Sequence, residues 1–109
     1  MTQQYEVIHY TENGRDIFND YILSLRDKRG RFNIERSVTR IEEGNFGEHR
    51  FCRNGVWEIV INYGPGYRVY YSMIGSTIVL LLCAGDKSTQ QKDITRAVEF
   101  LRKYKEEHK

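Results

Sequence analysis

The sequence has 109 residues, of which 39% are hydrophobic and 29% charged, and its formal net charge is +2. This predicts one domain over residues 1–109 and excludes the fibrous, disordered and disulfide-rich classes. The longest apolar run, residues 78–84, is too short to span a bilayer. Cys52 and Cys83 have neither CxxC spacing nor a histidine cluster. We therefore expect a reduced, cytoplasmic protein without cofactor, metal site or membrane partner.

The first half of the chain predicts one strand and a pair of helices. Residues 5–9 are typical of a strand, and Asn13, with Asp16 three positions later, predicts a helix start. Apolar side chains then recur at helical spacing, first at Ile17, Phe18, Tyr21, Ile22 and Leu25 and again at Ile34, Val38 and Ile41. A polar turn over residues 27–30 separates the two stripes, and Gly44 ends the second. Two short helices joined this closely predict an antiparallel helical hairpin.

After Gly47 the pattern changes to the alternation of strands. Two alternating segments flank a turn at residues 63–66, and residues 78–82 are apolar on both faces, as in a strand covered on both sides. Ser88 and Gln91 form a capping-box pattern that opens a last helix, with inward positions at Ile94, Ala97, Val98, Leu101 and Tyr104. The fold class predicted is α+β, with the N-terminal strand and the helices packed on one face of an antiparallel sheet.

Basic and aromatic side chains indicate where a site could lie. If Trp57, Ile59 and Ile61 face the core, the alternating Glu58 and Val60 face the other way. Arg68 follows a glycine turn at a strand start, and Lys87 follows the end of the apolar strand. Two interpretations remain open. These cations, with Arg53 and nearby tyrosines, could form a surface for phosphate and unpaired bases. Alternatively, Arg68 is an edge arginine paired with Glu58 or Asp86.

Two other basic segments permit a polyanionic partner but do not require one. The first is the run over residues 26–31, and the second is the last helix, which includes Lys92. From composition alone, a solvated turn and a solvated helix face are the favoured interpretation of both. His9, His49 and His108 are scattered along the chain, which favours surface positions rather than a shared metal or catalytic site.

Two segments carry a specific resemblance. Residues 56–71, VWEIVINYGPGYRVYY, and residues 80–94, LLLCAGDKSTQQKDI, resemble successive blocks of the HigB-like killer-protein branch of the RelE/ParE toxin superfamily. Residues 45–47 and the order of elements extend the similarity over nearly the whole chain. The resemblance implies a RelE-like fold and the toxin of a bacterial toxin–antitoxin pair. It also implies a cognate helix-turn-helix antitoxin as partner.

Toxins of this superfamily cut messenger RNA on the ribosome without a metal ion, so the resemblance implies a set of catalytic residues. Arg68 matches the arginine of the G-Y-R motif and is the predicted phosphate stabiliser. Lys87 could share this role or protonate the leaving oxygen. The acid and base candidates are Glu48, Glu58 and Asp93. The predicted RNA contacts are Arg53, Tyr67, Tyr70 and Lys92.

The chain departs from the superfamily pattern at two places, which leaves three functions open. Val60 stands where relatives often carry a basic residue, and no tyrosine or histidine follows Lys87 in the segment through Asp93. The first function is a ribosome-dependent endoribonuclease. The second is a toxin that inhibits DNA gyrase or another essential factor by binding, and the third is a detoxified antitoxin partner or co-repressor. Whether the chain is an enzyme is therefore undecided by sequence.

Overall fold

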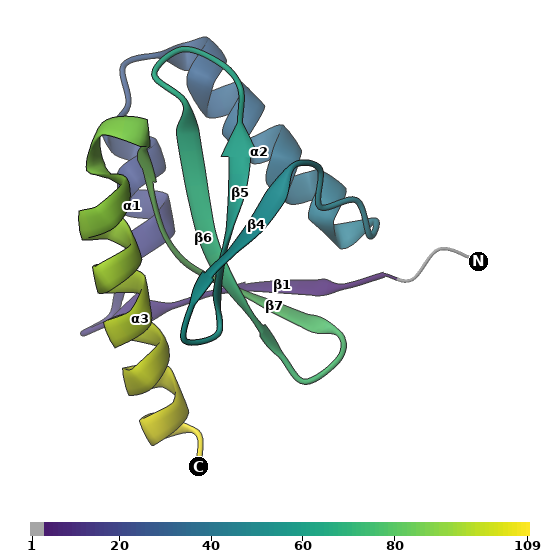
Figure 1. Ribbon diagram of the computed structural model, residues 1–109, viewed down its shortest axis with the longest axis vertical. Coiled ribbons are helices and arrows are strands. Elements are labelled where there is room, and N and C mark those ends of the chain that lie inside the picture. Colours follow the sequence, from purple (N-terminus) through teal and green to yellow (C-terminus); the bar gives the residue numbers. More distant parts are fainter. Residues whose placement is uncertain (1–3) are drawn as a thin grey trace.

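The computed structural model describes residues 4–109 (Figure 1). The strands are β1 (Glu6–His9), β2 (Thr11–Glu12), β3 (Arg15–Asp16), β4 (His49–Arg53), β5 (Val56–Ile61), β6 (Tyr67–Ile74) and β7 (Ile78–Asp86). The helices are α1 (Ile17–Ser24), α2 (Lys28–Glu42) and α3 (Gln90–Glu107), with a 3-10 turn, η1 (Lys87–Thr89), before α3. The α+β prediction is thereby confirmed.

The main sheet has five strands in the order β1-β7-β6-β5-β4. Strands β4 to β7 form an antiparallel meander, as predicted, but β1 pairs in parallel with β7, from Glu6 opposite Ile78 to His9 opposite Leu81. The sheet is therefore mixed. Parallel neighbours need a long connection, and here α1, α2 and the meander all lie between the two strands in sequence. Strand β7 lies between β1 and β6 and is buried on both faces, as its continuous apolar run predicted.

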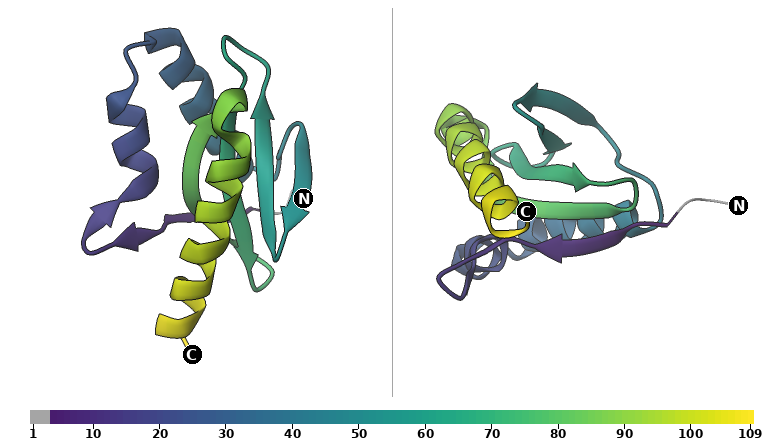
Figure 2. Two further views of the ribbon diagram at one scale, coloured as in Figure 1. Left: turned by 60° about the vertical axis from the view of Figure 1, so that its left-hand side comes forward. Right: turned by 90° about the horizontal axis from the view of Figure 1, so that it is seen from below.

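The helices cover both faces of the sheet, so the prediction of helices on one face is wrong. Phe18 and Ile22 of α1 and Ile34 and Ile41 of α2 pack in one apolar cluster with Ile59. A second cluster holds α3 against the other face, through Ile94, Ala97, Phe100 and Leu101. Figure 2 shows α3 on the opposite side of the sheet from α1 and α2. The reason lies in β5 and β7, whose apolar side chains on both faces need cover on both sides.

An irregularity in β7 contributes to this second cluster. Tyr70 lies opposite Cys83 and Tyr71 opposite Leu81, so Leu82 is an extra residue at a β-bulge. Because of the bulge, Leu82 and Cys83 both join the cluster beneath α3. The bulge thus turns two consecutive apolar side chains towards the same helix.

The helix starts differ from the predicted ones. Asn13 and Gly14 have positive φ and form the turn of the small β2–β3 hairpin, because an Asn-Gly pair suits that turn better than a cap. The cap of α1 is Asp16, whose side chain accepts from the Asn19 N–H at 2.9 Å. Helix α2 begins within the predicted turn over residues 27–30, where the side chain of Asp27 accepts from the Gly30 N–H at 2.9 Å.

Asp27 gives the fold a measurable pH dependence. The Gly30 N–H, and then the Tyr67 hydroxyl at 2.8 Å, hold the pKa of Asp27 below its usual value. A carboxyl group with a lowered folded-state pKa stabilises the fold above its unfolded pKa, about 3.9, and loses that contribution as the pH falls through the folded value. We expect Asp27→Asn to lower the urea midpoint at neutral pH. The difference from wild type should shrink below about pH 4. The surface variant Asp20→Asn is the control, and a difference independent of pH would contradict the expectation.

Within residues 4–109, no helix combines the length and apolarity needed to cross a membrane.

Candidate functional site

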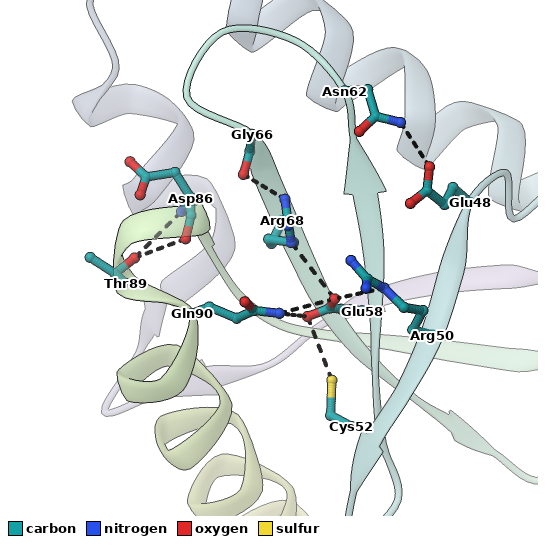
Figure 3. Close-up of polar contacts among 10 residues, drawn as sticks. All are labelled: Glu48, Arg50, Cys52, Glu58, Asn62, Gly66, Arg68, Asp86, Thr89 and Gln90. Atoms are coloured by element: carbon teal, nitrogen blue, oxygen red, sulfur yellow. Dashed lines mark hydrogen bonds and ion pairs between the residues drawn. The ribbon is translucent and has the colours of Figure 1, made fainter.

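A buried carboxylate, that of Glu58, gathers polar side chains on the α3 face of the sheet (Figure 3). Arg50 of β4 lies directly opposite Glu58 of β5, and Arg68 of β6 lies two pairs further along, opposite Val60. Strand alternation places Arg50, Glu58 and Arg68 on the same face of the sheet. Gln90, the first residue of α3, reaches the same carboxylate from above the sheet. We call Arg50, Cys52, Glu58, Arg68 and Gln90 the Glu58 cluster.

Four side chains contact the carboxylate of Glu58. The Gln90 amide donates to its two oxygens at 2.9 and 3.2 Å, and the Cys52 thiol donates at 3.7 Å. The Nε atoms of Arg50 and Arg68 lie 3.4 and 3.6 Å from Oε2. Only 3% of the Glu58 side chain and 7% of the Arg68 side chain are exposed, against 56% for Arg50. The cluster thus combines a buried ion pair with a second arginine that solvent reaches.

Two buried polar atoms of this region have no hydrogen-bond partner among the described residues. They are Nε of Arg68, which is in ionic contact only, and the hydroxyl of Tyr70, the residue opposite Glu58. Burial, and then the charge of Glu58, raise the pKa of Tyr70 well above its ordinary value, so the phenol keeps its proton. Buried polar groups are nearly always satisfied. The cluster therefore has unused hydrogen-bonding capacity.

The segment between β7 and α3 holds Gln90 over the sheet. Asp86 accepts from the Ser88 N–H at 2.8 Å and forms a capping box with Thr89. The predicted cap at Ser88 is therefore wrong: Asp86 caps η1, and no side chain caps α3. A Cβ at Gly85 would overlap the Asp93 carboxylate, so glycine is needed for helix and strand to come this close. The close approach fixes where α3 starts.

Arg68 and Lys87 both lie near Gly66, in the glycine turn before β6. A Cβ placed at Gly66 would lie 3.2 Å from Nη1 of Arg68 and 3.4 Å from Cβ of Lys87. Nη1 of Arg68 also donates to the Gly66 carbonyl at 2.8 Å. Lys87 is exposed. The structure therefore places the Arg68 guanidinium and the base of the Lys87 side chain against the same glycine. The pairing with Glu58 that the other interpretation gave is also present, but Arg68 lies on an inner strand and not at a sheet edge.

The remaining predicted polar residues lie outside the Glu58 cluster. Glu48 is exposed on the loop before β4, where it accepts from the Asn62 amide at 2.7 Å. Asp93 is buried and bonded to Thr89 and Arg96, so it connects the first turn of α3 to η1. Arg53 is exposed at the end of β4 and donates to Thr95 at 2.9 Å. Lys92 is exposed on α3. Of the three candidate carboxylates, only Glu58 contacts Arg68.

The prediction that Tyr67 and Tyr70 stack on RNA bases is wrong. Tyr67 is 3% exposed and its hydroxyl donates to Asp27 at 2.8 Å, while Tyr70 is fully buried. Neither ring offers a face to solvent. Both strand faces of β6 are covered, one by α2 and the other by α3, so alternation alone could not leave a tyrosine exposed there.

Sequence reasoning missed Arg50, Cys52 and Gln90. The signal for the first two was the pair Asn54-Gly55, whose positive φ values make the β4–β5 turn. This dipeptide is the strongest short-range indicator of a hairpin, and it pairs Arg53 with Val56. A regular hairpin would then place Phe51 opposite Glu58, and Arg50 takes that position only because Cys52 is the extra residue of a β-bulge, which the sequence pattern does not indicate. Burial raises the pKa of the Cys52 thiol to about 11, so it acts in the cluster as a neutral donor.

Comparison with known proteins gives one informative match. No protein-family model matches the chain. An uncharacterized protein of Haemophilus influenzae is 40% identical over 80 residues, which is 73% of this chain and 81% of that protein.

Proposed function

We propose a function for this chain, which belongs to the same family as the Haemophilus influenzae protein. The proposal rests on the residues of the chain itself: the protein is the toxin of a bacterial type II toxin–antitoxin system and has a RelE-like fold. It inhibits translation by metal-independent cleavage of messenger RNA on the ribosome. The resemblance of residues 56–71 and 80–94 to the killer-protein branch supports this. The observation that carries it is the position of the Arg68 guanidinium, which is paired with Glu58 and lies against Gly66 together with the base of the Lys87 side chain.

The proposed cleavage is a transesterification within the RNA. The 2′-oxygen bonds to the neighbouring phosphorus and the bond to the 5′-oxygen breaks, which leaves a cyclic phosphate and a 5′-hydroxyl. Arg68 and Lys87 stabilise the charge that builds on the phosphoryl oxygens. Glu58 takes the proton of the 2′-hydroxyl and Lys87 gives one to the leaving oxygen. Arg50, the most exposed group in contact with Glu58, meets an incoming phosphate first. Its displacement towards the phosphate uncovers the carboxylate.

A second candidate function is inhibition by binding, with DNA gyrase or another essential factor as the target. The observation in its favour is the engagement of Glu58 by four donors, which leaves the cluster with cations but no free base. In both cases we propose a helix-turn-helix antitoxin as partner. A segment of that antitoxin would cover the Glu58 cluster or pack on α1 and α2.

The test combines growth with mapping of RNA ends. Induced expression should stop growth. In translation reactions with purified protein, primer extension should reveal cuts within codons that appear only with ribosomes and persist with a metal chelator. Uncut messages, together with loss of gyrase supercoiling activity, would replace the first function with the second. Undisturbed growth, translation and supercoiling would contradict both.

A further inference from the structure

Helix α2 and the turn before it carry cations without partners. Six basic side chains of this segment make no ion pair and no side-chain hydrogen bond with any described residue: Arg26, Lys28, Arg29, Arg31, Arg36 and Arg40. On α3, Arg96, Arg102 and Lys103 are paired with Asp93, Glu99 and Glu12, whereas Lys92 and Lys105 make no ion pair with a described residue. Nearby opposite charge has therefore neutralised the three paired α3 cations but not those of α2.

Three of the free arginines share one side of α2. Arg29, Arg36 and Arg40 are separated by seven and four positions, a spacing that aligns side chains along a helix. They extend over roughly 16 Å of the axis at the usual helical rise. Phe32, whose exposed fraction is 61%, lies between the first two, and all three arginines are exposed. We call these four residues the α2 basic face.

The α2 basic face borders a groove of about 390 Å³ between α2, the loop before β4 and the end of β5. Arg36 and Arg40 line it together with the side-chain amides of Asn33, Asn45 and Asn62. Its acidic residue, Glu48, accepts from Asn62. The groove shares no lining residue with the Glu58 cluster, although one of its residues, Val60, lies opposite Arg68 in the sheet.

We propose that the α2 basic face and its groove bind single-stranded RNA, as a second surface distinct from the site of cleavage. The guanidinium groups contact phosphates, Phe32 stacks on a base, and the amides contact base edges. Cations combined with an exposed aromatic ring are typical of single-strand binding. An acidic peptide would use the same cations but would not need the aromatic platform or the amides. The inference relies on the proposed function only for the choice of RNA as the polyanion.

Binding to two faces gives the protein a defined orientation on the ribosome. The α2 basic face contacts an unpaired segment of ribosomal RNA, while the message binds at the Glu58 cluster, where Arg50 is the exposed cation. Such phosphate contacts fix position and register without reading sequence. Loss of the α2 contacts should therefore weaken binding to the ribosome, with a smaller effect on the positions at which the message is cut.

The experiment measures binding of a short fluorescent single-stranded RNA by anisotropy over a range of salt concentrations. Each phosphate contact contributes about 0.7 to the slope of log K against log salt. Arg36→Gln/Arg40→Gln should therefore reduce the magnitude of the slope by about 1.4. Phe32→Ala should weaken binding about tenfold through lost stacking. The matched control, Arg15→Gln/Arg102→Gln, removes the same formal charge from exposed arginines paired with Asp20 and Glu99, and should keep the wild-type slope.

Three results would overturn the inference. The first is a wild-type slope for Arg36→Gln/Arg40→Gln, with folding verified by the urea midpoint. The second is an equal loss in the control, which would show an effect of net charge alone. The third is competition by a polyglutamate peptide as strong as that by RNA and unaffected by Phe32→Ala, which would identify a protein-binding surface. If the protein cleaves the message but Arg36→Gln/Arg40→Gln leaves the salt slope unchanged, only this inference is contradicted. If the slopes change as expected but the wild type cleaves no message, only the proposed catalytic function is contradicted.

Discussion

Replacing Glu58 with alanine is expected to lower the free energy of unfolding by about 3–5 kcal/mol, the usual cost of removing one partner of a buried ion pair. Arg68 has only 7% of its side chain exposed, and Glu58 is its counter-ion. Without that carboxylate, the guanidinium is left uncompensated in the interior. Urea denaturation followed by circular dichroism measures the change.

Two controls separate the buried charge from the loss of side-chain contacts. Glu58→Gln/Arg68→Gln removes both charges while keeping hydrogen-bonding groups, and should be clearly more stable than Glu58→Ala. Glu99→Ala removes a carboxylate from an exposed pair with Arg102 and should change stability little. If Glu58→Ala unfolded at the wild-type urea concentration, the buried pair would not have the role assigned to it.

The second large effect is on cleavage. Arg68→Lys keeps the positive charge near Glu58 but replaces the planar fork of donors with a single ammonium group. We expect the rate of message cleavage to fall by about 10²–10³-fold, as when a donor to a transition-state oxyanion is lost. Stability should fall less than in Glu58→Ala, because the ion pair is retained.

This prediction is checked by single-turnover cleavage on programmed ribosomes. Arg15→Lys, at an exposed arginine paired with Asp20, is the matched control and should cut at the wild-type rate. If Arg68→Lys cleaved the message at a rate within a few-fold of wild type, a catalytic role for Arg68 would be contradicted, although its role in the fold would not.

The fold class could be predicted because its signals are local. The apolar stripes of α1 and α2, the turn at residues 63–66 and the two-sided run of β7 each specify their own element. The placement of α3 depends on long-range packing against Tyr70 and Leu82, and the parallel pairing of β1 joins segments about seventy residues apart in sequence. Neither relation leaves a local pattern.

The candidate site could be predicted only in part, for a similar reason. Arg68 and Lys87 lie at strand ends beside glycines, which marks them in the sequence. Gln90 reaches Glu58 only because Gly85 lets α3 approach β7, a contact that no periodicity encodes. Tyr67 and Tyr70 were misassigned because tyrosine is suited both to a buried strand and to an RNA-binding surface.

The central claim is that the Glu58 cluster, which includes Arg68, forms the catalytic site of the protein together with Lys87. The most direct test is mapping of message ends in a ribosomal translation reaction with the charge-balanced variant Glu58→Gln/Arg68→Gln, after its folding has been verified. The account predicts cuts within codons for the wild type and none for the folded variant. Equal cutting by both proteins would contradict it and locate the chemistry elsewhere on the molecule.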